Sequence, residues 1–175
     1  MPTRQEPQYP SEVETLMALN PVQLTQQLIT IFQAMLPSPG VVASQLANAY
    51  TAYAKGGQFG ASTPFILPTN TAALQGPLLA ALLVPAAGNP ATFAAAWAAG
   101  VVAFWAGVPI VGPQMGTVIP PIGAAALSGV LIPVFSNIAS TAPLTAALLA
   151  GALHTATLTT SSTVAPPPAT VLPIL

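Results

Sequence analysis

Residues 93–108 read FAAAWAAGVVAFWAGV, a run of sixteen residues without a charge, a side-chain amide or a hydroxyl group. Asn89 and Pro90 precede the run in the arrangement of a helix N-cap followed by proline at the first helical position. The sequence therefore predicts a helix over 90–106. Its bulky side chains recur every three or four residues and form one stripe, with a second tryptophan beside it: Phe93, Trp97, Val101, Phe104, Val108 and Trp105. Whether lipid or protein covers this stripe decides what kind of molecule the chain is.

Several properties of this segment favour burial by protein. The stretch 91–108 is only eighteen residues long before Pro109, whereas a membrane-spanning helix needs about 20 predominantly apolar residues. Eight of the eighteen residues are alanines, and no lysine or arginine flanks the segment to orient it in a bilayer. We therefore expect a helix buried by protein, with its aromatic residues in a core instead of a ligand-stacking site.

The chain is almost free of charge. Two of its 175 residues are Lys or Arg and three are Asp or Glu, so 3% are charged, against about 25% in an average soluble domain. No charged side chain follows Lys55. Because a surface with almost no net charge favours association, we expect other protein subunits or lipid to cover much of it. Two basic residues are too few to neutralise a row of phosphates, which excludes an electrostatic nucleic-acid surface.

The residues that catalysis needs are missing from most of the chain. All three carboxylate side chains lie within the first fourteen residues, and aspartate and cysteine are absent. Carboxylate pairs, a Ser-His-Asp triad and carboxylate or thiolate metal sites therefore have no candidates in the body of the protein. His154 is expected near a helix end, where exposed carbonyl groups favour a protonated ring in a structural role. We predict no enzymatic activity, no catalytic, cofactor-binding or metal-binding residues, and no small-molecule substrate.

The pattern of helix starts and apolar segments predicts a mainly α fold. We expect a compact bundle of about five to seven short, alanine-rich helices, joined by ordered loops rich in proline and glycine, with extended arms at both termini. The N-terminal arm covers 1–10, a single helical domain covers 11–160, and a proline-rich apolar C-terminal arm covers 161–175.

Capping signals and apolar periodicity place the individual helices. Asn20 and Ser38 each precede a proline, as Asn89 does, and are expected N-caps. Pro133 is expected to kink or split the segment that contains it. The expected helices and apolar helical segments are 12–19, 21–35, 39–55, 71–84, 90–106, 121–139 and 143–154.

The connections and the C-terminal tail are predicted to be loop or extended chain. Proline and glycine punctuate 56–70 and 108–121, and β-branched residues favour a short strand or an extended arm over 154–160. The prolines of 164–168 favour polyproline II. For the apolar end, 171–175, two alternatives stand: it docks onto a neighbouring subunit, or it folds back onto the core of its own chain.

These features favour a non-enzymatic structural subunit of a large protein assembly, such as a phage or virus particle or a tail-like machine. Neighbouring subunits, including further copies of the same chain, would bury its uncharged surface, and it would reside in a virion or another extracellular particle. The expected interaction residues are those of the apolar tail and the aromatic stripe: Val171, Leu172, Ile174, Leu175, Phe93, Trp97, Phe104 and Trp105.

Two alternatives remain open. The first is a small integral membrane protein with alanine-rich spans, which the mean hydropathy of +0.72 favours. The second is an uncharged adhesion or binding module at a surface. No motif in the sequence calls for a cofactor under any of the three hypotheses.

Overall fold

A computed structural model describes residues 19–34, 37–57, 70–84, 89–106, 108–110, 115–121, 123–137, 140–165 and 170–174. Within these residues the chain forms six helices and four strands. The helices are α1 (Pro21–Gln33), α2 (Pro39–Ala54), α3 (Thr71–Leu83), α4 (Pro90–Trp105), α5 (Ala124–Ser136) and α6 (Ala142–Thr157). The strands are β1 (Pro109–Ile110), β2 (Met115–Ile119), β3 (Ser161–Ala165) and β4 (Thr170–Pro173). The predicted mainly α fold is confirmed, whereas the predicted N-terminal arm 1–10 and most of helix 12–19 lie outside the described residues.

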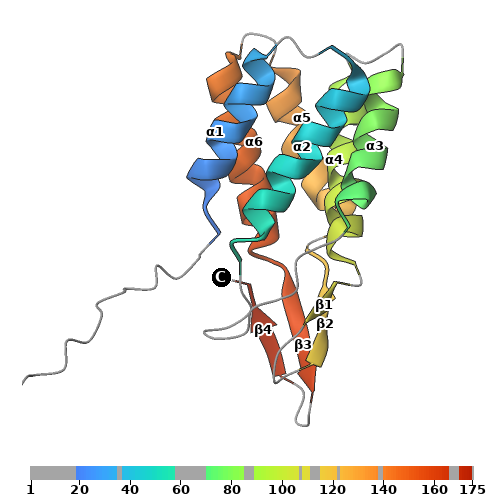
Figure 1. The fold of residues 1–175 in the computed structure, drawn as a ribbon, viewed down its shortest axis with the longest axis vertical. Helices are drawn as coiled ribbons and strands as arrows, with labels where there is room; N and C mark the ends of the chain where they lie inside the picture. Colours follow the sequence, from blue (N-terminus) through green and yellow to red (C-terminus); the bar gives the residue numbers. More distant parts are fainter. Residues whose placement is uncertain are drawn as a thin grey trace, which may run out of the picture.

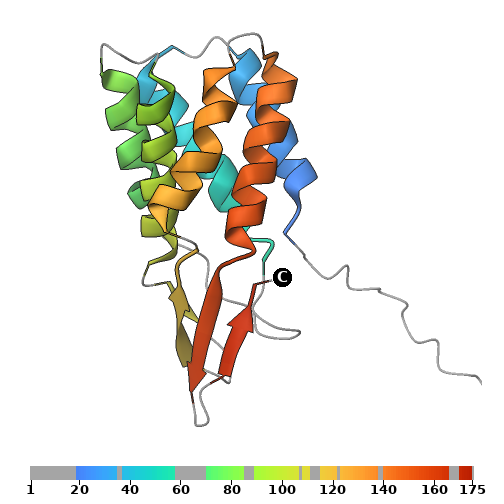
Figure 2. The same ribbon diagram turned by 180° about the vertical axis from the view of Figure 1, so that it is seen from behind.

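The helices form one bundle, and a small sheet projects from one end of it (Figures 1 and 2). Each helix packs on the helices before and after it in the chain, and α6 returns to pack on α1, so the bundle closes around a shared core. The sheet is antiparallel with strand order β1-β2-β3-β4. β2 pairs directly with β3, although α5 and α6 lie between these two strands in the sequence. Thr117 lies opposite Thr163.

Three helices begin at the predicted caps. Asn20 Oδ1 accepts hydrogen bonds from two backbone N–H groups in the first turn of α1, at 3.0 and 3.1 Å. Ser38 Oγ and Asn89 Oδ1 each accept one such bond, at 3.4 and 3.0 Å. These oxygens satisfy N–H groups that have no partner inside the helix. The capping residues therefore fix where α1, α2 and α4 begin.

The predicted strand over 154–160 is wrong, because α6 continues through Thr157 and the strand β3 starts only at Ser161. The hydroxyl groups of the threonines in this segment are satisfied within the helix. Thr155 Oγ1 donates to the Gly151 carbonyl at 2.9 Å, and Thr157 Oγ1 donates to the Leu153 carbonyl at 2.7 Å. Each hydroxyl thus finds its acceptor one turn back in the same helix.

Pro133 does not split its segment. α5 runs continuously from Ala124 to Ser136 with Pro133 inside its last turn. A proline removes the hydrogen bond to the carbonyl four residues earlier, here that of Gly129. Gly129 is exposed, so solvent can satisfy this carbonyl and the helix continues.

The aromatic stripe of α4 lies in the core formed by the chain's own helices. Trp97, Val101, Phe104 and Trp105 have no exposed surface. The ring of Tyr50, from α2, lies edge-on to two of them, with its centroid 5.2 Å from that of Phe104 and 6.5 Å from that of Trp97. The predicted burial of α4 by protein is therefore confirmed.

Among the helices in the described part of the chain, none combines the length and the apolarity that crossing a membrane requires.

The C-terminal strand folds onto its own chain. β4 pairs with β3 in antiparallel register, with Val171 opposite Thr163. Beyond β4, the Ile174 N–H donates to the Thr160 carbonyl at 3.2 Å, and the Ile174 side chain is only 1% exposed. Of the two alternatives for the tail, the described residues show the one in which it returns to the core of its own chain.

Helices α3 and α4 approach each other closely at Gly100. A Cβ atom at this position would lie 2.6 Å from Leu74 Cδ1 and 3.2 Å from Leu74 Cα. Both distances are too short for carbon atoms in van der Waals contact, which lie about 3.5–4.0 Å apart. The spacing of α3 and α4 therefore requires glycine at position 100.

The variant Gly100→Ala is expected to lower the free energy of unfolding by about 1–3 kcal/mol, because the added methyl group forces α4 away from Leu74. Gly129→Ala is the matched control, since a Cβ atom there would meet nothing within 4 Å. Alanine's higher helix propensity should make this control about 0.5–1 kcal/mol more stable. Urea unfolding followed by circular dichroism measures both, and equal responses would contradict the close approach.

Candidate interaction surface

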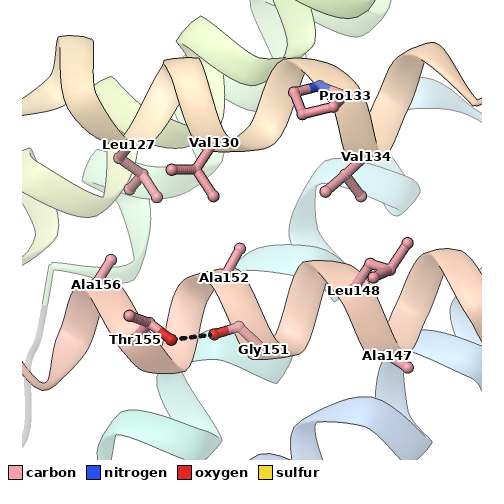
Figure 3. A pocket seen from close by; sticks show the side chains of 10 residues that line it. All are labelled: Leu127, Val130, Pro133, Val134, Ala147, Leu148, Gly151, Ala152, Thr155 and Ala156. Atoms are coloured by element: carbon pink, nitrogen blue, oxygen red, sulfur yellow. Dashed lines mark hydrogen bonds between the residues drawn. The ribbon is translucent and has the colours of Figure 1, made fainter.

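An open apolar groove of about 520 Å³ lies between α5 and α6. In Figure 3 the side chains of Val130 and Val134 point from α5 toward α6, and that of Ala152 points back. The full lining consists of Leu127, Val130, Pro133 and Val134 of α5 and Ala147, Leu148, Gly151, Ala152, Thr155 and Ala156 of α6. Thr155 has the only polar side chain in this set, and its hydroxyl already donates to the Gly151 carbonyl. The groove therefore offers apolar contact and very little hydrogen bonding.

The groove exists because the facing residues of α6 are small. α5 packs more closely on α4 than on α6, and Phe135 of α5 meets Phe93 of α4 edge to face, with ring centroids 4.9 Å apart. On α6, Ala152 and Ala156 point toward α5 in Figure 3, and their short side chains leave space between the two helices. A Cβ atom built at Gly151 would meet no atom within 4 Å. The space along α6 is thus left unfilled by the chain itself.

Large apolar side chains at the groove are exposed to solvent. The exposed fractions are 53% for Val130, 48% for Leu144 and 43% for Leu148. Leu144 lies one helical turn before Leu148, on the same side of α6. Single exposed apolar residues are ordinary, but a contiguous apolar patch around a groove marks an interaction site.

Most of the predicted interaction residues lie inside the molecule. Trp97, Phe104 and Trp105 are fully buried, and Phe93 is half-buried against Phe135. Their apolar surface stabilises the fold of this chain. In the tail, Ile174 is buried as well, and nothing is described for the side chains of Val171, Leu172 and Leu175.

The sequence did contain a signal for the α5–α6 surface. α6 buries Leu149 and Leu153 on one side and exposes Leu144 and Leu148 on another. A helix that is apolar on two sides needs two partners, whereas an amphipathic surface helix needs one. A prediction that gives each helix a single buried stripe therefore misses the second apolar side of α6.

A series of buried hydrogen bonds links α2, α4 and α6. Trp105 Nε1–H donates to the Tyr50 hydroxyl oxygen at 2.9 Å. The Tyr50 hydroxyl lies 2.7 Å from Thr157 Oγ1, which itself donates to the Leu153 carbonyl, so Tyr50 is the donor to Thr157. Burial raises the pKa of Tyr50 to about 12, which keeps its hydroxyl uncharged at neutral pH. These hydrogen bonds satisfy the buried hydroxyl group of Tyr50 and link α2, α4 and α6.

Replacing Tyr50 with phenylalanine is expected to lower the free energy of unfolding by about 1–3 kcal/mol, because its buried partners lose the hydroxyl. Tyr53→Phe is the control, and its effect should be smaller because its partner, His154, is only partly buried. Thermal and urea unfolding measure the two effects. A loss for Tyr50→Phe no greater than that for Tyr53→Phe would argue against the buried link.

Tyr53 and His154 form a second polar pair near the end of α6. The Tyr53 hydroxyl oxygen lies 2.7 Å from His154 Nδ1. Burial raises the pKa of Tyr53 above its ordinary value and lowers the pKa of His154. The tautomer of the His154 ring decides which of the two side chains donates the proton in this hydrogen bond. Desolvation therefore acts on the pKa of His154 in the direction opposite to the effect expected from the carbonyl groups at the helix end.

The stability of the protein is expected to decrease as the pH falls below about 6.5, the ordinary pKa of histidine. The unfolded chain protonates His154 at that ordinary pKa, whereas the folded chain does so only at a lower pH. Protonation therefore favours the unfolded state in this window. The urea midpoint at about pH 7.5 and about pH 5.5 measures the effect. His154→Gln should remove most of the difference, and a variant that kept it would refute the assignment.

A second pocket, of about 410 Å³, lies between α1 and α2. Its polar lining includes the amides of Gln27, Gln45 and Asn48. Gln27 Oε1 is buried and meets no hydrogen-bond donor among the described residues. The described residues contain no group of three or more His, Cys, Asp or Glu that could hold a metal ion. The polar side chains that line this pocket are thus uncharged amides and the hydroxyl of Thr30.

Comparison of the chain with protein families, with curated proteins and with solved structures finds no match. A function is therefore inferred from the residues and the geometry of the chain itself.

Proposed function

We propose that this protein is a non-enzymatic structural subunit of a large protein assembly, of the kind that forms a phage or virus particle or a tail-like machine. The observation that carries the proposal is the open apolar groove between α5 and α6, lined by exposed Val130 and Leu148, with exposed Leu144 one helical turn before Leu148. Removing apolar surface from water contributes about 25 cal/mol per Å². In the assembly, neighbouring subunits cover this surface, and the protein resides in a virion or another extracellular particle.

The distribution of charge supports the same proposal. No charged side chain occurs from Gly56 to Leu175, so α3, α4, α5 and α6 have no charge with which to keep separate molecules dispersed. The centres of protein interfaces are depleted in charged residues relative to the rest of a protein surface. An uncharged face therefore suits a subunit whose surface is covered after assembly.

The polar groups described above also favour a structural role. Tyr50 and Thr157 are buried and hydrogen-bonded to each other, and His154 is paired with Tyr53. The groove itself provides one hydroxyl, that of Thr155, which is engaged with its own helix. Catalysis requires positioned acids, bases or nucleophiles at an accessible site, and these groups stabilise helices instead.

Fractionation of the native source tests the proposed function. The chain is expected to leave the source in aqueous buffer without detergent, in a particle of uniform size that contains other protein chains or many copies of this one. Hydroxyl-radical footprinting should then show Leu144 and Leu148 protected in the particle and reactive in the isolated chain. Sedimentation with membranes and release only by detergent would refute the proposal.

A further inference from the structure

The six helices form three successive pairs with the same dimensions. The first helix of each pair, α1, α3 or α5, has 13 residues, and the second, α2, α4 or α6, has 16. Successive pairs begin roughly 50 residues apart, a period that is found in proteins built from repeated units. We call the pairs α1–α2, α3–α4 and α5–α6 units 1, 2 and 3.

The same positions are buried in all three units. In each second helix the fifth, eighth, ninth, twelfth, fifteenth and sixteenth residues are buried. In each first helix the buried residues are the fourth, eighth and eleventh. Helical periodicity explains the spacing of these residues, but it does not require that they lie at equal distances from the helix start. The buried residues of the three first helices are Leu24, Leu28 and Ile31; Leu74, Leu78 and Ala81; and Leu127, Leu131 and Val134.

A strand with the same sequence pattern follows two of the units. The sequence is TVIP over 117–120, at the end of β2, and TVLP over 170–173, in β4. Each of these strands pairs with the strand before it, β1 or β3, in antiparallel register. The corresponding segment after α2 lies outside the described residues.

Units 1 and 3 also have the same hollow. Every residue that lines the α1–α2 pocket has the position of a residue that lines the α5–α6 groove. Gln27 and Asn48 of unit 1, for example, have the positions of Val130 and Gly151 of unit 3. In unit 2 the eleventh residue of the second helix is Gly100, which lets α3 lie close against α4. The two hollows are thus one feature of the unit, with amide side chains in unit 1 where unit 3 has none.

We infer that the chain consists of three copies of one helix–helix unit, and that the contact between successive units is one interaction surface used three times, with another unit of the same kind as its partner. The second helix of each unit packs on the first helix of the next, and α6 packs on α1. The units therefore form a closed ring, as separate subunits do in a cyclic trimer. This inference is independent of the proposed function.

Equivalent residues occupy the contacts between units. At the α4–α5 contact, Phe93, the fourth residue of α4, meets Phe135, the twelfth residue of α5. Val42 and Leu82 have these two positions at the α2–α3 contact, and both are half-buried against the core. Phe32 of α1 has the position of Phe135 at the α6–α1 contact and is half-buried as well. The residue of α6 at the position of Phe93 is a threonine, so this third contact is apolar on one side only.

The test moves the sequence of a helix from one unit into another unit of the full-length chain. Replacing residues 124–136 by the α1 sequence PVQLTQQLITIFQ keeps leucine at 127 and 131 and phenylalanine at 135, and introduces Val134→Ile. Because equivalent helices bury the same positions, this variant should keep its helical circular dichroism signal and unfold in one transition. Its urea midpoint should change by about 1 M or less.

A matched control places nearly the same residues one position out of register. The sequence of residues 20–32, NPVQLTQQLITIF, replaces residues 124–136, so that three buried positions become polar through Leu127→Gln, Leu131→Gln and Val134→Thr. Buried amides and hydroxyls without partners are costly, so this control should lose the cooperative transition. If the control unfolds at the same urea concentration as the in-register variant, the position within the unit has no effect and the inference is overturned.

The reciprocal variant makes the test independent of one particular replacement. Here the α5 sequence AAALSGVLIPVFS replaces residues 21–33, which keeps leucine at 24 and 28 and introduces Ile31→Val. It should also unfold in one transition, at a urea midpoint lower by about 1 M or less. A cooperative transition in either in-register variant, together with an unfolded control, supports the inference. The absence of that transition from both in-register variants overturns it.

Discussion

Three helices that are far apart in the sequence meet at the hydroxyl group of Tyr50. It accepts a hydrogen bond from Trp105 of α4 and donates one to Thr157 of α6, while its ring packs edge-on against Phe104. A buried phenol without partners would be costly, so both bonds must form when the ring enters the core. These two hydrogen bonds fix the buried faces of α4 and α6 relative to each other. The orientation of α6 in turn determines which residues of α6 and of its neighbour α5 face solvent.

The sequence predicts the helices well because their signals are local. The capping residues of α1, α2 and α4 and the aromatic stripe of α4 act within one or two turns, so their pattern survives folding unchanged. The sheet is less accessible to prediction. Residues 108–121 are expected to be loop or extended, but the partner of β2 is β3, and the pairing depends on how α5 and α6 fold between them. The groove is harder still, because it is a property of two helices and of the small residues between them.

Small residues have opposite effects in different parts of the bundle. At Gly100 the missing side chain lets α4 lie against Leu74 of α3, and the contact is closed. Gly151 is exposed, and a Cβ atom added there would meet nothing within 4 Å, so no neighbouring helix makes use of the missing side chain. A glycine in a helix thus predicts only that close approach is possible. The side chains and the other contacts of the facing helix decide whether it happens.

The groove is held by the chain at both of its ends. At one end α6 follows α5 as the next element of the chain. At the other end β2 leads into α5 and β3 follows α6, and these two strands are hydrogen-bonded to each other in register. The pairing of β2 with β3 therefore limits how far α5 and α6, the two sides of the groove, can separate before a partner binds. A preformed groove loses little conformational entropy when it is occupied, so most of the free energy gained by covering its apolar surface remains available for binding.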